Sequence, residues 1–152
     1  MKPTSLLAST ALLAAVVSLS AQNSPPPRQQ AAPAHTPTES NVAYGPHERQ
    51  VLDFYQAKSD NPTPVLFFIH GGGWVTGDKK NPGSLSQCLA AGISVVSINY
   101  RYSWQAQIDG VKPPVQAPLH DAARALQFVR SKSKEWNLDK ERIGASGGSA
   151  GA

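Results

Sequence analysis

A serine set among glycines, and three glycines after a histidine, are the features of this sequence that could do chemistry. Gly147–Gly151 reads Gly-Gly-Ser-Ala-Gly and fits G-x-S-x-G, the pattern of a sharp strand-to-helix turn that presents a nucleophilic serine. Glycines two positions before and after Ser149 would avoid side-chain clashes in that turn. An overlapping match, Gly144–Gly148, would instead make Ser146 the nucleophile. It would leave a preceding strand of about three residues against the usual five or six, so we predict that Ser149 is the nucleophile.

The second motif is His70–Trp74, His-Gly-Gly-Gly-Trp, which directly follows an apolar segment. Three glycines leave backbone N–H groups unshielded, so that an oxyanion can approach them closely. Nucleotide sites also place glycines after a strand, but the spacing here fails. A phosphate loop requires Lys and then Ser or Thr where the chain has Asp78 and Lys79, and a dinucleotide loop requires glycine in place of Thr76. Glycines that merely form a tight turn remain the alternative.

Strand-like and helix-like segments alternate along the chain, and they would position both motifs. Runs rich in apolar, β-branched and aromatic residues predict strands at 50–55, 65–69, 93–99 and 142–147. Apolar residues at helical spacing predict helices at 84–91 and 119–132, whereas the proline-punctuated segment 100–118 is expected to be a loop. This order predicts an α/β fold with a parallel, doubly wound sheet. Both glycine motifs would then lie beyond the carboxyl ends of strands, where such sheets bind ligands.

Residue spacing within the two predicted helices indicates which faces meet the core. The helix over 119–132 places five apolar residues on one face: Leu119, Ala122, Ala123, Leu126 and Val129. His120 and Asp121 fall at its start, where capping and a favourable interaction with the helix dipole account for them. Cys88, the single cysteine, excludes an intramolecular disulfide and is predicted to be a small buried side chain in the helix over 84–91.

Composition and the amino-terminal residues narrow the class of protein. Residues 1–21 carry Lys2 before a short apolar run and predict a secretory signal, hence export to the periplasm or beyond. A retained membrane anchor is the alternative, although the run is shorter than the roughly 20 residues of a membrane span. Residues 22–40 are rich in proline and predict a disordered tether, so the folded domain is expected over 41–152. The formal charge of +4 is mild and scattered, which argues against a nucleic-acid partner.

The stretch from about His47 to Ala152 resembles the amino-terminal half of the α/β-hydrolase esterases and lipases related to hormone-sensitive lipase. It is especially similar to their feruloyl-esterase-like, BD-FAE-type branch. Besides the two glycine motifs, the segments that carry the resemblance are Val51–Tyr55, Asn99–Tyr102 and Arg142–Gly144. The resemblance implies an ester hydrolase that forms a serine acyl-enzyme, requires neither cofactor nor metal, and acts on a small or sugar-linked ester.

The resemblance also implies roles for individual residues. Ser149 would accept the acyl group, and an oxyanion hole would consist of the backbone N–H groups of Gly72, Gly73 and Ala150. Four further residues would form the scaffold of the two motifs: His70, Gly71, Gly147 and Gly151. Trp74 and Tyr102 are candidates for lining the substrate pocket, and core packing accounts for them equally well.

In this fold the catalytic triad runs Ser, then Asp or Glu, then His, and only Gly151 and Ala152 follow Ser149. We therefore expect the triad acid and base to be missing, the chain as written to be inactive, and the sheet to be truncated after the strand of the serine turn. An unpaired sheet edge at 143–147 should make the chain poorly stable. A prolyl-oligopeptidase-type serine peptidase and a non-catalytic binding module of the same fold are the alternatives; three glycines followed by Trp favour the esterase.

Overall fold

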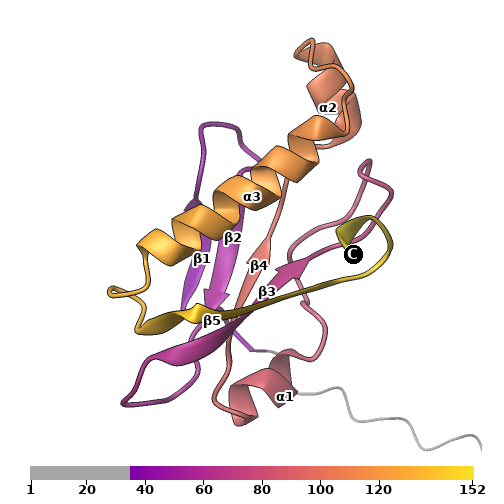
Figure 1. Ribbon diagram of the computed structural model, residues 1–152. Helices are drawn as coiled ribbons and strands as arrows, with labels where there is room; N and C mark the ends of the chain where they lie inside the picture. Colours follow the sequence, from indigo (N-terminus) through magenta and orange to yellow (C-terminus); the bar gives the residue numbers. More distant parts are fainter. Residues whose placement is uncertain (1–34) are drawn as a thin grey trace, which may run out of the picture. The chain divides into compact units, whose positions relative to one another are not determined.

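The computed structural model of the protein describes residues 35–152 (Figure 1). The expected secretory signal and all but the end of the expected tether lie outside these residues. The first element of the described residues is strand β1 (Glu39–Ala43), which starts just inside the segment expected to be a tether. Within the described part of the chain, no helix combines the length and apolar character that a membrane crossing requires.

Five strands form one sheet in the order β1-β2-β4-β3-β5. The other four strands are β2 (Val51–Tyr55), β3 (Thr63–Ile69), β4 (Ser94–Ile98) and β5 (Leu138–Gly147). β3 pairs in parallel with both β4 and β5, whereas β2 runs antiparallel to both of its neighbours. The predicted α/β fold is therefore confirmed, with a sheet whose parallel part is β4-β3-β5.

In the part of the chain that the structure describes, three helices connect or cover these strands: α1 (Leu85–Ala90), α2 (Ser103–Ile108) and α3 (Gln116–Ser131). Figure 1 shows α3 crossing one face of the sheet. The core lies under α3, where Ala125 and Val129 meet Val65, Phe67 and other strand residues. A stacked pair of rings, Phe54 and Trp136 with centroids 4.5 Å apart, closes the core beyond the end of α3.

Several expectations about the helices were wrong in detail. The segment expected to be an unbroken loop contains α2, and α3 begins at Gln116 rather than at Leu119. The buried face also differs from the expected one: Leu119 is 67% exposed and Ala123 is exposed, whereas Ala125 is buried. Cys88 is only half-buried, because no residue of the short helix α1 is fully covered.

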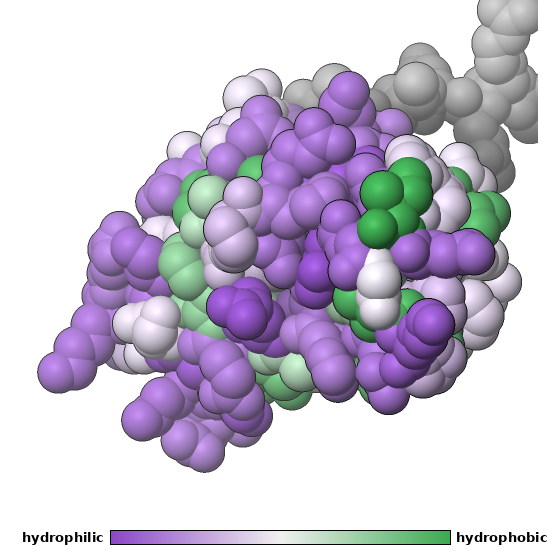
Figure 2. All heavy atoms as spheres, turned by 90° about the horizontal axis from the view of Figure 1, so that it is seen from above, coloured by the Kyte–Doolittle hydropathy of each residue, from purple (hydrophilic) through white to green (hydrophobic). Residues whose placement is uncertain are grey.

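The strand before the serine turn is longer than expected, because β5 spans ten residues and begins at Leu138 rather than at Arg142. β5 lies at one edge of the sheet, and its residues Gly144, Ala145 and Ser146 are exposed. The surface seen from above is mostly hydrophilic, with hydrophobic side chains in separate patches (Figure 2).

Candidate active site

The turn after β5 holds Ser149 in a strained backbone conformation. Its φ angle is +55°, in the left-handed region that residues other than glycine seldom occupy. Gly148 before it is extended, and a short 3₁₀ turn, η1 (Ser149–Gly151), follows. Ser149 itself is exposed. The alternative serine, Ser146, lies inside β5 opposite Phe68 of β3.

Glycines on either side of Ser149 allow the turn to pack against β3. A Cβ atom on Gly147 would lie 2.1 Å from the carbonyl oxygen of Gly151 and 2.6 Å from that of Ile69. A Cβ atom on Gly151 would lie 2.1 Å from the same Ile69 oxygen. Since all of these obstacles are backbone atoms, neither position can accept a larger residue without moving the turn.

The glycine loop that follows β3 lies beside this turn. A Cβ atom on Gly71 would be 2.6 Å from the carbonyl oxygen of Gly148 and 3.6 Å from Cβ of Ser149. Gly72 and Gly73 have φ angles of +113° and +60°, which only glycine adopts readily. The structure therefore brings together the two motifs that the sequence singled out, which lie more than seventy residues apart.

The hydrogen bonds of the glycine loop leave two of its backbone N–H groups without a partner in the described residues. The carbonyl of Gly72 accepts bonds from the N–H groups of Val75 and Thr76, both 3.1 Å long. No hydrogen bond within residues 35–152 uses the N–H group of Gly72 or Gly73. Two adjacent free N–H groups next to an exposed serine are the arrangement that an oxyanion hole requires.

Trp74 joins the glycine loop to the serine turn. Its indole Nε1–H donates to the carbonyl oxygen of Ala150 over 3.1 Å. Its ring also borders a cavity of about 270 Å³ next to the turn. The remaining walls are mostly apolar: Ile69, Tyr100, Val115, Gln116, Pro118, Leu119, Ala122, Ala150, Gly151 and Ala152. Leu119, expected in the core, is thus a wall of this cavity.

His70 is buried beneath the glycine loop. Its ring stacks on Tyr100 with centroids 4.3 Å apart, and its Nδ1–H donates to the carbonyl oxygen of Gly71 over 2.7 Å. Within residues 35–152, Nε2 has no hydrogen-bond partner. Burial lowers the pKa of His70 more than the bond to Gly71 raises it, so the ring is neutral near pH 7.

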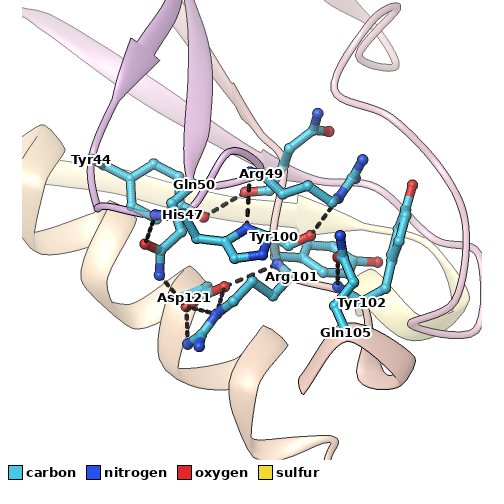
Figure 3. Close-up of polar contacts among 10 residues, drawn as sticks. Tyr44, His47, Arg49, Gln50, Tyr100, Arg101, Tyr102, Gln105 and Asp121 are labelled. Carbon is cyan, nitrogen blue, oxygen red and sulfur yellow. Dashed lines mark hydrogen bonds and ion pairs between the residues drawn. The ribbon is translucent and has the colours of Figure 1, made fainter. Parts of the chain in front are cut away.

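Tyr102 lies outside the cavity and holds the far end of the glycine loop. Its hydroxyl donates to the carbonyl oxygen of Gly77, to which the guanidinium of Arg49 also donates over 3.2 Å. The same guanidinium donates from Nε to the carbonyl oxygen of Tyr100 over 2.8 Å and lies 3.7 Å from the centre of the Tyr102 ring. Figure 3 shows Arg49 between the two tyrosines. The sequence did not indicate that Arg49 contacts this loop, because Arg49 belongs to a polar turn and to no motif.

A second polar cluster fixes the segment after β4 to α3 (Figure 3). The carboxylate of Asp121 accepts bonds from the Arg101 guanidinium at 2.8 Å and from the Arg101 backbone N–H at 2.9 Å. The side chain of Gln50 adds a third donor, 2.7 Å away. Burial alone would raise the pKa of Asp121, but these hydrogen bonds outweigh it and hold the pKa below its ordinary value. Asp121 was expected in the first turn of a helix; it is instead the sixth residue of α3 and is buried.

The geometry thus combines an exposed serine in a strained turn, free N–H groups and an adjacent apolar cavity. Within the described residues, no three His, Cys, Asp or Glu side chains are grouped so that they could hold a metal ion. Comparison with known sequences adds the family: the profile of the BD-FAE family matches residues 52–152. The chain belongs to the BD-FAE family.

Individual relatives of this BD-FAE chain carry names of esterases. It is 35% identical to the "Probable isoprenylcysteine alpha-carbonyl methylesterase" of Arabidopsis thaliana, over 74% of this chain and 22% of the plant protein. Among solved structures, a truncated carbohydrate esterase from gut microbiota is 28% identical with a TM-score of 0.62, over 75% of this chain and 40% of that one. An acetyl ester-xyloside bifunctional hydrolase from Caldicellulosiruptor lactoaceticus is 32% identical with a TM-score of 0.56, over 66% and 35%. The chain therefore spans less than half the length of each of these relatives.

Proposed function

We propose that this chain carries the nucleophile and the oxyanion-hole donors of a serine carboxylic ester hydrolase. The observation that carries the proposal is the left-handed backbone of Ser149 directly beside the glycine loop, where Gly71 and Gly148 approach too closely for a Cβ atom. Strain of this kind persists where the surrounding structure enforces it, and it is concentrated at functional sites. Membership of the BD-FAE family and the esterase names of the relatives support the same function.

In the proposed reaction, Oγ of Ser149 attacks the carbonyl carbon of the ester, and its proton passes to a general base. The carbonyl oxygen becomes an oxyanion that accepts hydrogen bonds from the N–H groups of Gly72, Gly73 and Ala150. Collapse of this intermediate breaks the bond to the alcohol, which leaves with the proton held by the base. Water then attacks the acyl-enzyme in the same way, which releases the acid and restores the serine.

We further propose that the base and its carboxylate partner come from outside the described residues. No hydrogen bond within residues 35–152 joins Ser149 to a histidine. The ring of His70 stacks on that of Tyr100. His35 is hydrogen-bonded to Ser86, and Nδ1 of His47 accepts a hydrogen bond from the backbone N–H of Arg49. Without a base, the Ser149 hydroxyl stays protonated and weakly nucleophilic, so residues 35–152 alone should not turn over esters.

The substrate proposed is an ester of a small acid, with a sugar-linked alcohol as one class. The cavity beside Ala150 is small and mostly apolar, which suits a short acyl chain. The names of two structural relatives, a carbohydrate esterase and an acetyl ester-xyloside hydrolase, support the sugar-linked class.

Labelling with a fluorophosphonate, followed by peptide mapping, tests the proposal on the protein produced from its native gene. Label should attach to Ser149; Ser149→Ala should remove it, and the matched control Ser146→Ala should retain it. Label on Ser146 would overturn the assignment of the nucleophile. A protein without any label would be a binding module, and hydrolysis of prolyl peptides but not of p-nitrophenyl acetate would make it a peptidase.

A further inference from the structure

We propose that Trp74 is a positioning residue that fixes the spacing between the two sides of the oxyanion hole, an inference that rests on the proposed function. Two of the proposed donors, the N–H groups of Gly72 and Gly73, belong to the loop that Trp74 ends. The third, the N–H group of Ala150, belongs to the serine turn. A direct bond between the loop and the turn would set the distance between these donors.

The bond from the Trp74 indole provides that link. Its Nε1–H donates to the carbonyl oxygen of Ala150 over 3.1 Å, so Trp74 holds the residue that supplies the third donor. Gly71 touches the turn as well, but only through close packing against the carbonyl of Gly148. The indole bond is therefore a specific, directional connection between the two sides, and it is made by a side chain.

The backbone of Trp74 is held in the conformation from which the indole makes this bond. Its φ angle is +61°, an outlier for a bulky aromatic residue, which costs free energy. The carbonyl oxygen of Trp74 accepts a bond from the N–H of Ser103, at the start of α2, over 2.8 Å. Lining a cavity with an indole would require neither the strained backbone nor the bond to Ala150.

The bond from the Trp74 indole should affect the transition state of the attack by Ser149. The negative charge on the ester oxygen appears as Ser149 attacks, and it is stabilised only if the donors from both sides reach it at 2.7–3.1 Å. If the loop and the turn drift apart by a fraction of an ångström, the bound ester is little affected, whereas the oxyanion loses stabilisation. Loss of the indole N–H should therefore lower kcat rather than raise KM.

The test replaces Trp74 with β-(3-benzothienyl)alanine, which keeps the shape of the indole but carries sulfur in place of the N–H. Trp74→Phe provides a genetically simple companion. Trp104→Phe is the matched control, because Trp104 is exposed to a similar degree, 49% against 41%, and packs on Tyr102 instead of the cavity. The protein produced from its native gene is assayed with p-nitrophenyl acetate, and the affinity for a boronic acid that mimics the tetrahedral intermediate is measured in parallel.

Both Trp74 variants should lower kcat about three- to tenfold with KM within about twofold, as expected for the loss of one neutral hydrogen bond. Boronic acid affinity should fall by a similar factor, and Trp104→Phe should change neither. An unchanged kcat in the benzothienyl variant, or an effect on KM alone, would show that Trp74 only lines the cavity. Failure of the wild-type protein to hydrolyse any ester would instead refute the proposed function, so the two failures are distinguishable.

Discussion

The ammonium group of Lys79 lies 2.8 Å from Oδ2 of Asp53, and the two side chains are only 4% and 5% exposed. Lys79 follows the glycine loop, whereas Asp53 lies in β2, so this buried ion pair fastens the far end of the loop segment to the sheet. The backbone of Lys79 is held as well. Its N–H donates to Oδ1 of Asn99, and its carbonyl oxygen accepts from the Ser97 hydroxyl, both over 2.7 Å.

Lys79→Met should lower the free energy of unfolding by about 3–5 kcal/mol, because it leaves the Asp53 carboxylate buried without its counter-charge. Urea unfolding followed by circular dichroism measures the change. Lys132→Met is the matched control: Lys132 pairs with the exposed Glu135, and such surface pairs contribute about 1 kcal/mol or less. Equal stability of the two variants would contradict the structural role of the buried pair. Adding Asp53→Leu to Lys79→Met should recover part of the loss, because the unpaired charge is then removed.

The ion pair between Asp121 and Arg101 predicts a dependence of stability on pH. Hydrogen bonds hold the pKa of Asp121 below its ordinary value in the folded protein. The ionised Asp121 therefore contributes fully to the free energy of unfolding at any pH above its pKa in the unfolded chain, about 3.9. As the pH falls through the folded pKa, that contribution is lost. Asp121→Asn should be less stable at pH 7 and should show a shallower loss of stability on acidification than the wild type. Parallel slopes for the two proteins in urea unfolding at pH 2.5–7 would refute the assignment.

The sequence predicted the elements that carry strong local patterns. The apolar run before the glycines, the β-branched run of β4 and the glycine motifs all specify their structure within a few residues. The bounds and the buried face of α3 were less predictable. Leu119 lines the cavity instead of the core, and the buried stripe runs through Ala117, Asp121, Ala125 and Val129. This stripe has a spacing of four, so an aspartate in an otherwise apolar row was a readable signal of a buried ion pair.

Other parts of the site depend on contacts that no local pattern encodes. Arg49 reaches Gly77 and Tyr100, which lie 28 and 51 residues away, and the indole of Trp74 reaches Ala150 across 76 residues. These bonds depend on how loops from three strands meet at the end of the sheet. The antiparallel pairing of β2 is also a property of the assembled sheet, because the residue pattern of β2 is compatible with both parallel and antiparallel pairing.

The environment of His70 predicts a neutral ring with its proton on Nδ1. Burial lowers its pKa, and the carbonyl oxygen of Gly71 can only accept, so Nδ1 must be the donor. Nitrogen-15 NMR should show one protonated ring nitrogen that begins to titrate below the ordinary value of about 6.5. Below that pH, His70 is protonated in the unfolded chain but stays neutral in the folded protein. The free energy of unfolding should therefore fall as the pH is lowered. A His70 that titrates at or above the value measured in urea would contradict this.

Gly151→Ala should disable the site by moving the serine turn. The new Cβ atom would lie 2.1 Å from the carbonyl oxygen of Ile69, so the turn or the end of β3 must shift. Overpacking of this kind costs about 1–3 kcal/mol, and a displacement of about 1 Å at a nucleophile can cost on the order of 100-fold in rate. Gly144→Ala is the control in the same region, because nothing lies within 4 Å of its Cβ position. Rates of fluorophosphonate labelling at Ser149 measure the effect. If both alanine variants label as fast as the wild type, the close packing of Gly151 on β3 does not hold Ser149 in its strained conformation.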